Sequence, residues 1–323
     1  MAKLKIGTRG SELARWQAHT VAALLHERAD VECEIVIIKT TGDRLSEAKL
    51  SQIGGKRLFV KEIEDALLAG EVDLAVHSSK DMPAALPEGL AIGAVLERED
   101  PRDAIVLPRV VEAPLSLEDV VRELGRAPRI GTSSIRRVAQ LTRLFPGAEF
   151  LPIRGNLDTR LRKLDAGDYD AIVLAAAGLR RLQQSARISS YLPIAACVPA
   201  PGQGIIAVEI RDGDTAVAAL VGTIHDRIAG IALSVERAVV QRLGGGCQMP
   251  IGAYAAIDDT AVVVKAIVVS PDGARAATAE IDGRADEPEA AGNAAAEQLL
   301  ASGASQILED VLRQQAAVEG LQP

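Results

Sequence analysis

The chain has 323 residues, of which 48% are hydrophobic but only 2% aromatic, and its formal net charge is −8. This length predicts two or three domains, and the hydrophobic fraction excludes the disordered and fibrous classes. The cores must be aliphatic, because three Phe, three Tyr and one Trp cannot fill them.

Localisation is predicted from hydropathy and cysteine usage. No run of apolar residues reaches the length of a membrane span, and residues 1–7 lack the apolar segment of a signal peptide. The three cysteines, Cys33, Cys197 and Cys247, are widely spaced and form no C-x-x-C pair. We therefore expect a cytoplasmic protein with reduced thiols.

The first part of the chain alternates short apolar strands with amphipathic helices. We expect strands at 3–8, 33–39, 73–76 and 91–96, and helices beginning at Ser11 and covering 59–69. A polar stretch from 40 to 56 ends in Gly54-Gly55-Lys56. Connections of that length are usually functional lids or disordered segments.

A second block of similar alternation follows the predicted crossover at 100–103. We expect strands at 104–107, 129–131, 149–153 and 170–175, and helices after Ser116, from about Ser134 and at 157–165. Residues 199–204 mark another crossing, which leads into a strand at 205–210. Two blocks of this kind predict two lobes that face a cleft, where ligands bind.

The remainder predicts a smaller α+β domain. We expect a helix at about 225–242, strands near 251–257, 261–269 and 274–282, and an Ala-rich helix pair to the end. The predicted fold is therefore α/β, with two lobes and a C-terminal α+β domain.

The net charge is unevenly distributed. Residues 276–323 hold nine acidic residues against Arg284 and Arg313, a balance of −7. Residues 129–162 hold seven arginines against Glu149 and Asp158, a balance of +5. A basic centre of this kind predicts an anionic partner.

Several common signatures do not apply. The sequence contains no H-E-x-x-H, no G-x-S-x-G and no Cys/His cluster with metal-ligand spacing. Residues 202–207 match G-x-G-x-x-A, but a β-type run follows instead of a helix, so we interpret the match as accidental. Neither a metal nor a nucleotide cofactor is indicated.

A polar cluster, Ser78-Ser79-Lys80-Asp81, directly follows an apolar strand. At the carboxyl end of a buried strand such a cluster faces a cleft, although a solvated turn before Pro83 is the alternative. The Asp81 carboxylate could transfer a proton or stabilise a developing cation there.

Three strand-to-helix junctions carry arginine. They contain Arg9 before Ser11, Arg136 and Arg137 after Ser134, and Arg154 with Arg160. Hydroxyls and N–H groups at helix starts bind anions, and arginine binds carboxylate or phosphate bidentately. Because Arg136 and Arg137 are adjacent, we expect them to point in different directions, so that they need not bind one anion.

Cys247 lies in a tight loop, Gly244-Gly245-Gly246-Cys247-Gln248-Met249-Pro250. Glycine lets the backbone approach another group closely, so the thiol is suited to nucleophilic attachment. An inert loop thiol is the alternative. Cys33 and Cys197 lie in apolar surroundings and are interpreted as core residues.

These motifs together resemble the porphobilinogen deaminase (hydroxymethylbilane synthase) family over nearly the whole chain. The resemblance rests on residues 8–11, 54–56, 58–62, 77–81, 97–103, 131–137, 154–160 and 245–248. Arg57 stands where the family has a glycine.

The resemblance implies two lobes like those of type II periplasmic binding proteins and a third domain. Their boundaries would be 1–99 with 200–222, 104–197, and 226–323. It implies a transferase that joins four porphobilinogens head to tail with loss of ammonia and releases hydroxymethylbilane. A dipyrromethane primer would be attached through Cys247, and a monomer is expected.

The resemblance also implies residue roles. Asp81 would be the catalytic residue that stabilises the electron-poor azafulvene formed when ammonia leaves. The cofactor would contact Ser78, Lys80, Asp81, Ser134, Arg136 and Arg137, and the substrate would contact Arg9, Ser11, Lys56, Phe59, Arg154, Arg160 and Gln203.

Two other functions account for parts of this pattern. A basic centre also suits nucleic acid, but the chain is short of aromatic residues for base stacking, and Arg dominates over Lys in compact junctions. A non-catalytic two-lobed binding protein for a small dicarboxylate would use the arginines but needs no loop thiol. We expect partners to include neither nucleic acid nor a membrane.

Overall fold

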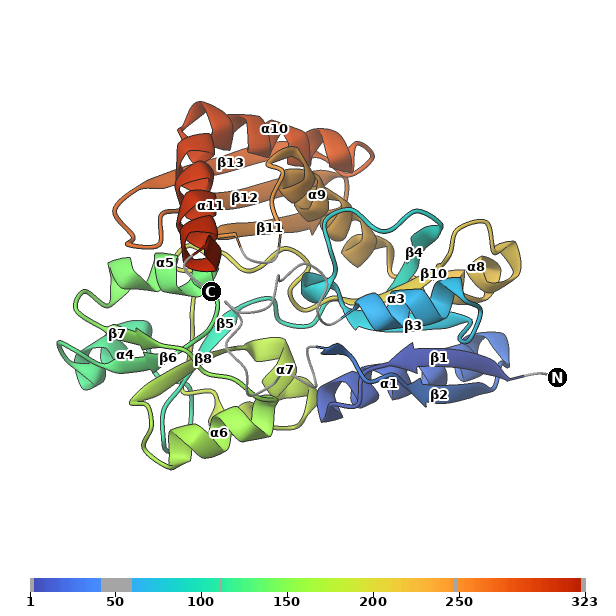
Figure 1. Cartoon of the computed structure of the whole chain (residues 1–323), viewed down its shortest axis with the longest axis horizontal. Helices are drawn as coiled ribbons and strands as arrows, with labels where there is room; N and C mark the ends of the chain where they lie inside the picture. Colours follow the sequence, from blue (N-terminus) through green and yellow to red (C-terminus); the bar gives the residue numbers. More distant parts are fainter. Residues whose placement is uncertain (1–2, 42–59, 111, 247–248, 321–323) are drawn as a thin grey trace.

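The computed structural model describes residues 3–41, 60–110, 112–246 and 249–320, and it gives no account of the side chains of residues 317–320. Two five-stranded sheets lie side by side, and a three-stranded sheet with its helices lies above them (Figure 1). The predicted α/β fold with two lobes and a C-terminal α+β domain is confirmed.

The first lobe contains a sheet in the order β2-β1-β3-β10-β4. Its strands are β1 (Leu4–Thr8), β2 (Cys33–Ile37), β3 (Leu74–Ser78), β4 (Leu90–Val95) and β10 (Ile206–Arg211). Helices α1 (Glu12–Ala29) and α8 (Thr215–Gly222) share one core with the sheet, and α3 (Lys61–Leu68) packs in another. Strand β10 returns from far along the chain and pairs antiparallel with β3 and β4.

The second lobe repeats this arrangement, with the order β7-β6-β8-β5-β9 and an antiparallel β5 in the place of β10. Its strands are β5 (Asp103–Val106), β6 (Arg129–Gly131), β7 (Glu149–Leu151), β8 (Ala171–Ala175) and β9 (Ser190–Tyr191). Its helices are α4 (Leu117–Leu124), α5 (Ile135–Leu144), α6 (Leu157–Asp165) and α7 (Ala176–Arg181). Helices α4 and α5 share one core with the sheet, and α6 and α7 share the other.

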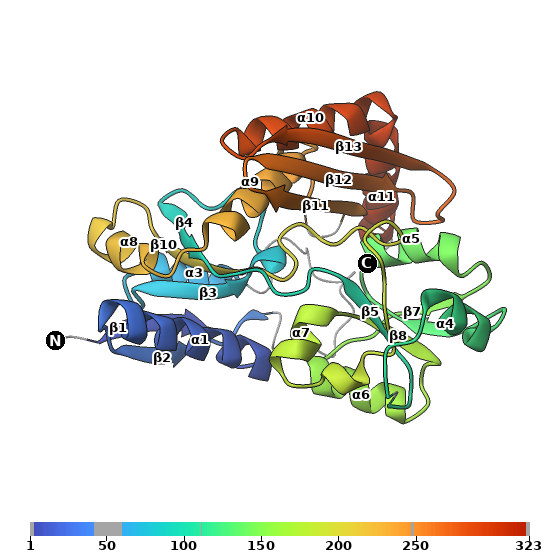
Figure 2. The same cartoon turned by 180° about the vertical axis from the view of Figure 1, so that it is seen from behind.

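The third unit is a meander of β11 (Ile251–Asp258), β12 (Ala261–Val269) and β13 (Ala276–Arg284). Helices α9 (Arg227–Arg242), α10 (Pro288–Ala301) and α11 (Ala304–Gly320) contribute to its aliphatic core (Figure 2). Valine and alanine fill this core almost entirely, as the shortage of aromatic residues predicts.

Two chain crossings connect the lobes and run side by side. The N–H of Leu96 donates to the carbonyl of Ile206, and the N–H of Glu99 donates to the carbonyl of Gly204, both at 3.0 Å. Gly202 and Gly204 have φ of +72° and +90°, a backbone region that glycine adopts without strain. The residues that follow form strand β10 and not a helix, as predicted.

The described residues contain no single helix that is long and apolar enough to cross a membrane. Helices α8 and α9 reach the length and apolar composition of a membrane span only when taken together, and they are bent by 116° at the break between them. Both helices bury apolar side chains inside the protein.

Candidate functional site

The three strand-to-helix junctions that carry predicted site residues are the starts of α1, α5 and α6. Each helix begins with a side-chain cap, in which an oxygen accepts a backbone N–H three residues on. The capping residues are Ser11 of α1, Ser134 of α5 and Asn156 of α6. The caps explain why each arginine lies at the first turn of a helix or just before it.

The polar cluster after β3 folds into a short 3-10 helix, Ser79–Asp81. Ser79 is 4% exposed and Lys80 is partly buried, whereas Asp81 is exposed. Ser78 accepts a hydrogen bond from Nε2 of Gln17 at 2.8 Å. The cluster is therefore not a fully solvated turn, which was the alternative interpretation.

Arg136 and Arg137 converge on a single carboxylate, that of Asp103. Arg136 Nη2 lies 2.8 Å from Asp103 Oδ2, and Arg137 Nη2 lies 2.7 Å from Oδ1. The expectation that these arginines point in different directions is wrong. Both side chains are more than nine-tenths buried, and a buried guanidinium needs a counter-charge, which Asp103 at the start of β5 supplies to both.

Gln203 links this pair of arginines to the cluster after β3. Its Nε2 donates to Asp103 Oδ1 at 2.9 Å, and its Oε1 accepts from Lys80 Nζ at 3.3 Å. Burial and the charge of Arg137 lower the pKa of Lys80 to about 8, against the opposing effects of Asp81 and Asp103. A buried lysine beside arginines favours an anion as its partner.

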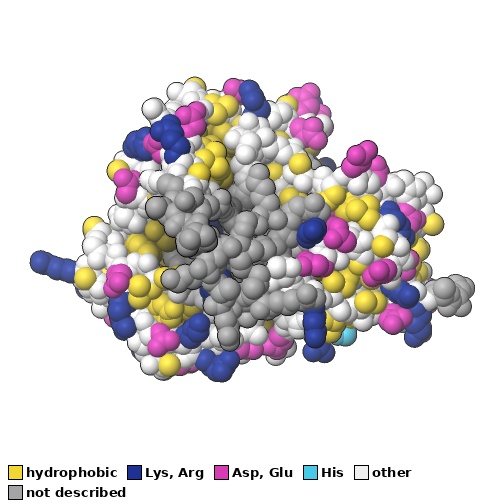
Figure 3. All heavy atoms as spheres, in the orientation of Figure 1, with side chains coloured by type: hydrophobic (Ala, Val, Ile, Leu, Met, Phe, Trp, Pro, Cys, Tyr) yellow, Lys and Arg dark blue, Asp and Glu magenta, His cyan; other side chains and the backbone are white. Residues whose placement is uncertain are grey.

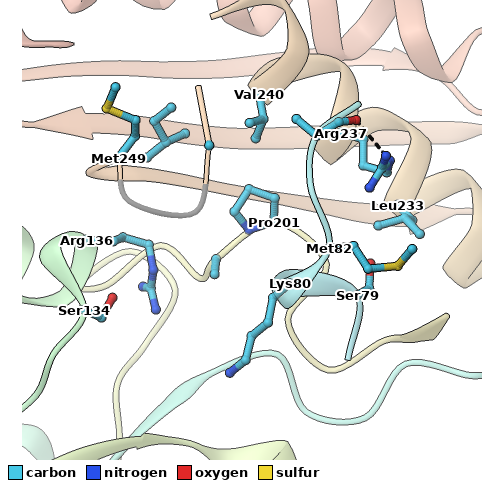
Figure 4. A pocket seen from close by; sticks show the side chains of 14 residues that line it. Ser79, Lys80, Met82, Ser134, Arg136, Pro201, Leu233, Arg237, Val240 and Met249 are labelled. Atoms are coloured by element: carbon cyan, nitrogen blue, oxygen red, sulfur yellow. Dashed lines mark hydrogen bonds between the residues drawn. The ribbon is translucent and has the colours of Figure 1, made fainter. Parts of the chain in front are cut away.

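A pocket lies where the three units meet, next to these groups. Lys80, Ser134 and Arg136 line it together with Ser79, and Figure 4 shows the Lys80 and Arg136 side chains extending toward the same side. The remaining wall is mainly apolar and comes largely from the third unit, through Leu233, Val240, Met249 and Ile251.

Two side chains that line this pocket each contain a polar atom without a hydrogen-bond partner among the described residues. These atoms are Nε of Arg136 and Oγ of Ser79, and both are buried. Such orphaned groups cost free energy unless a ligand satisfies them.

Beyond the pocket, charges from both lobes interact across the cleft. Burial, together with the charges of Arg137 and Arg9, lowers the pKa of Arg160 to about 10, while Asp81 opposes that effect. Arg9 and Asp81 belong to the first lobe, whereas Arg137 and Arg160 belong to the second. The structure thus places these four predicted site residues in one electrostatic environment.

Among the described residues, Ser11 and Arg154 do not line the pocket. The hydroxyl of Ser11 serves as a helix cap, and the carbonyl of Arg154 accepts from Lys163 Nζ. Lys56, Phe59 and Cys247 lie outside the described residues, although Gly246 and Met249, which bracket residues 247 and 248, both line the pocket.

Sequence reasoning missed three kinds of site residue. Asp103 and Ser79 lie within the motifs 97–103 and 77–81, but no role was predicted for either. No sequence pattern indicated that residues of α9 and β11 form the apolar wall. Cys197, predicted to be a core thiol, is fully buried as expected but lies 3.5 Å from Asp103 Oδ2 and from Arg136 Nη1. Burial and the Asp103 carboxylate raise the pKa of this thiol to about 12.

One face of the protein surface carries charges of both signs. On the face drawn in Figure 3, Lys and Arg side chains are interspersed with Asp and Glu and form no broad basic patch among the described residues. Arg136 and Arg137 are only 4% and 7% exposed. These two arginines are therefore inside the protein, where Arg136 lines the pocket.

The fold and the site define a two-lobed protein with a pocket, partly lined by cations, where the lobes meet a third unit. Residues 4–219 match the family profile described as "Porphobilinogen deaminase, dipyromethane cofactor binding domain", and residues 231–301 match "Porphobilinogen deaminase, C-terminal domain". The chain belongs to the porphobilinogen deaminase family.

Curated relatives agree over almost the full length. The chain is 46% identical over 311 residues to porphobilinogen deaminase of Thiobacillus denitrificans, covering 96% of this chain and 99% of the relative. It is 46% identical over 321 residues to that of Moorella thermoacetica, covering 99% of this chain and 100% of the relative.

Among solved structures, immunogenic lipoprotein A of Vibrio vulnificus is 12% identical to the chain, with a TM-score of 0.43. The match covers 70% of this chain and 96% of that one.

Family membership establishes the reaction class. The chain is a transferase of tetrapyrrole synthesis that polymerises porphobilinogen, and its cofactor is dipyrromethane.

Proposed function

We propose that the chain joins four porphobilinogens head to tail on a dipyrromethane primer attached to Cys247, and releases hydroxymethylbilane. The observation that carries this proposal is the pocket. It combines Lys80, Ser134 and Arg136 with an apolar wall, and it is bordered by Gly246 and Met249 on either side of Cys247 and Gln248.

The residues of the pocket fit a dipyrromethane. Each pyrrole ring carries carboxylate side chains on an apolar ring, so a complementary site needs cations and hydroxyls beside apolar surface. Nε of Arg136 and Oγ of Ser79 are donors without partners there, and Leu233 and Val240 offer apolar contact. When bound, the primer supplies the free pyrrole carbon to which the first substrate unit is joined.

Cofactor contacts are proposed for Ser78, Lys80, Asp81, Ser134, Arg136 and Arg137. Substrate contacts are proposed for Arg9, Ser11, Lys56, Phe59, Arg154, Arg160 and Gln203. The first set includes the pocket cations, and the second includes arginines whose charges meet across the cleft. Guanidinium groups suit this task because they bind carboxylates in a bidentate, planar fashion.

Asp81 is proposed as the catalytic residue. In each cycle the C–N bond of the substrate aminomethyl group breaks and ammonia leaves, so positive charge develops on the pyrrole. A C–C bond then forms, and a proton leaves the attacked pyrrole carbon. Asp81 is exposed in the 3-10 helix that follows β3, and its charge acts on both Lys80 and Arg160. Its carboxylate can there stabilise the cation and accept the proton.

Three further assignments belong to the proposal. The domains comprise 1–99 with 200–222, 104–197 and 226–323, supported by the pairing of β10 within the first sheet. The enzyme acts as a monomer in the cytoplasm, and the cytoplasmic assignment is supported by its sparse cysteines, which form no C-x-x-C pair. It has neither nucleic-acid nor membrane partners, supported by the burial of the central arginines.

Intact mass of the purified protein tests primer attachment. We expect a covalent adduct on the wild type that is absent from Cys247→Ala. The Cys33→Ala variant is the matched control and should keep the adduct, because Cys33 lies in β2 of the first sheet. An unmodified wild-type mass would contradict the proposal and favour a binding protein for a small dicarboxylate.

Turnover tests the catalytic assignment. We expect Asp81→Asn to abolish product formation while the adduct survives, because the substitution keeps the shape and removes the negative charge. Asp168→Asn, an exposed carboxylate in the second lobe, serves as the control and should keep normal turnover. Full activity of Asp81→Asn would refute the catalytic role.

A further inference from the structure

Asp103 is the most fully bonded carboxylate around the pocket. It is completely buried at the first position of β5, directly after the crossing between the lobes. Its oxygens accept from Arg136 Nη2, from Arg137 Nε and Nη2, from Gln203 Nε2 and from the thiol of Cys197. The arginine and glutamine donors lie 2.7 to 3.0 Å away, and the thiol lies 3.5 Å away.

This bonding separates Asp103 from the chemistry of the reaction. A carboxylate whose two oxygens already accept from five donors has little capacity left to take a proton from a substrate. The neighbouring arginines hold the pKa of Asp103 well below its usual range, although burial opposes them. Asp103 therefore stays a fixed negative charge.

The geometry of Arg136 shows what this charge does. Its Nη2 is held by Asp103, and its Nη1 donates to the carbonyl of Val198 at 2.7 Å. The two ends of the guanidinium are thus fixed, and Nε is the nitrogen that remains without a partner among the described residues. Because Arg136 lines the pocket, its ion pair with Asp103 fixes the orientation of the guanidinium beside the pocket.

The same carboxylate reaches the other side of the pocket. Gln203 donates to Asp103 and to the carbonyl of Pro101, so its amide is fixed with the oxygen toward Lys80. The negative charge of Asp103 also favours the charged form of Lys80, against burial and the arginine charges. One buried group thereby acts on cations from both lobes.

We propose that Asp103 is the positioning residue of the anion site: it presets Arg136 and, through Gln203, Lys80 for the carboxylates of the pyrrole ligand. This inference rests on the proposed function for the identity of the ligand. Preset donors avoid the cost of reorganisation when the ligand binds, which is how fixed charges contribute most to catalysis.

The test is Asp103→Asn in the full-length holoenzyme. The substitution keeps the shape of the side chain and removes its charge. We expect kcat/KM to fall about a hundredfold, the loss typical of misplacing a catalytic or binding group by about 1 Å. Asp170→Asn is the matched control, because Asp170 also forms an ion pair with an arginine. That arginine, Arg129, begins β6 and does not line the pocket. The control variant should retain wild-type kcat/KM.

A second readout separates positioning from simple loss of stability. Lysine residues are methylated with a ¹³C label, the Lys80 resonance is assigned with Lys80→Arg, and its titration is followed by NMR. We expect Lys80 to titrate at lower pH in Asp103→Asn than in the wild type, because a negative charge near the ammonium is lost. Asp170→Asn should leave that titration unchanged.

The outcomes are distinct. A reduced thermal midpoint with wild-type kcat/KM and unchanged Lys80 titration would show that Asp103 only stabilises the fold, and would overturn the inference. If Asp103→Asn does not fold, Gln203→Met decides: a lower Lys80 titration supports the inference, and an unchanged one overturns it. Failure of the proposed function appears instead in the wild type, as a missing adduct and missing product.

Discussion

Gly204 offers a quantitative test of how the crossing between the lobes is built. Its φ of +90° lies where a side chain is strained, at a cost of about 1–2 kcal/mol. A Cβ at this position would lie 2.2 Å from the carbonyl oxygen of Glu99 in the neighbouring crossing. Because that oxygen is backbone, one crossing must move, and overpacking of this kind adds about 1–3 kcal/mol.

Gly213 is the matched control. It has a similar φ of +80°, but a Cβ there meets no atom within 4 Å. Gly213→Ala should therefore cost only the backbone strain, partly offset by about 0.4–1 kcal/mol because alanine restricts the unfolded chain. The same offset applies to Gly204→Ala, so we expect it to lower the free energy of unfolding by about 1–5 kcal/mol, and Gly213→Ala by about 1 kcal/mol.

Urea denaturation followed by circular dichroism measures both variants. Activity adds a second measure, because Gly204 follows Gln203, whose amide must stay within 2.9 Å of Asp103. We expect kcat/KM to fall in Gly204→Ala and to stay normal in Gly213→Ala. Equal denaturation midpoints for the two variants would refute the close contact between the crossings.

Three other predictions follow from buried polar groups. The pKa of Lys80 is lowered from its usual 10.5 to about 8, so its ammonium is lost as pH rises through 8. A pH–rate profile should therefore show kcat/KM falling above pH 8. This decrease should be absent in Lys80→Arg, whose side chain keeps its charge. Glu236→Gln should lower the free energy of unfolding by about 3–5 kcal/mol in chemical denaturation, because the fully buried carboxylate pairs with Arg98 and accepts two backbone N–H groups. Ser79→Ala should raise the free energy of unfolding of the primer-free protein by about 1 kcal/mol, because a buried hydroxyl without a partner is removed. It should also reduce the stabilisation that the primer provides. An unchanged stabilisation by the primer would contradict a role for Ser79 in binding.

The three strand-to-helix junctions could be predicted because their signals are local. An apolar run ends, a Ser or Asn follows, and a helix begins with that residue as its cap. Helix α8 could have been found in the same way, because Asp214 caps it by accepting the N–H of Val217. Helix α7 has no side-chain cap and only six residues, so it left no comparable signal.

The role of Asp103 could not be predicted because its partners are distant in sequence. Arg137 lies 34 residues away and Gln203 lies 100 residues away. Only the folded crossings bring them to one carboxylate. The same holds for the wall of the pocket, where Leu233 and Val240 read in sequence as ordinary positions of an amphipathic helix.

The distribution of charge favours a ligand with several carboxylates. Among the described residues around the pocket and between the lobes, six cations accompany two carboxylates, Asp81 and Asp103; the cations are Arg9, Lys80, Arg136, Arg137, Arg160 and Arg237. A chain of pyrroles adds carboxylates with every unit, and so suits a site in which positive charge predominates. The overall charge of −8 conceals this excess, because the acidic residues lie mostly in the C-terminal part of the chain and the cations lie where the ligand binds.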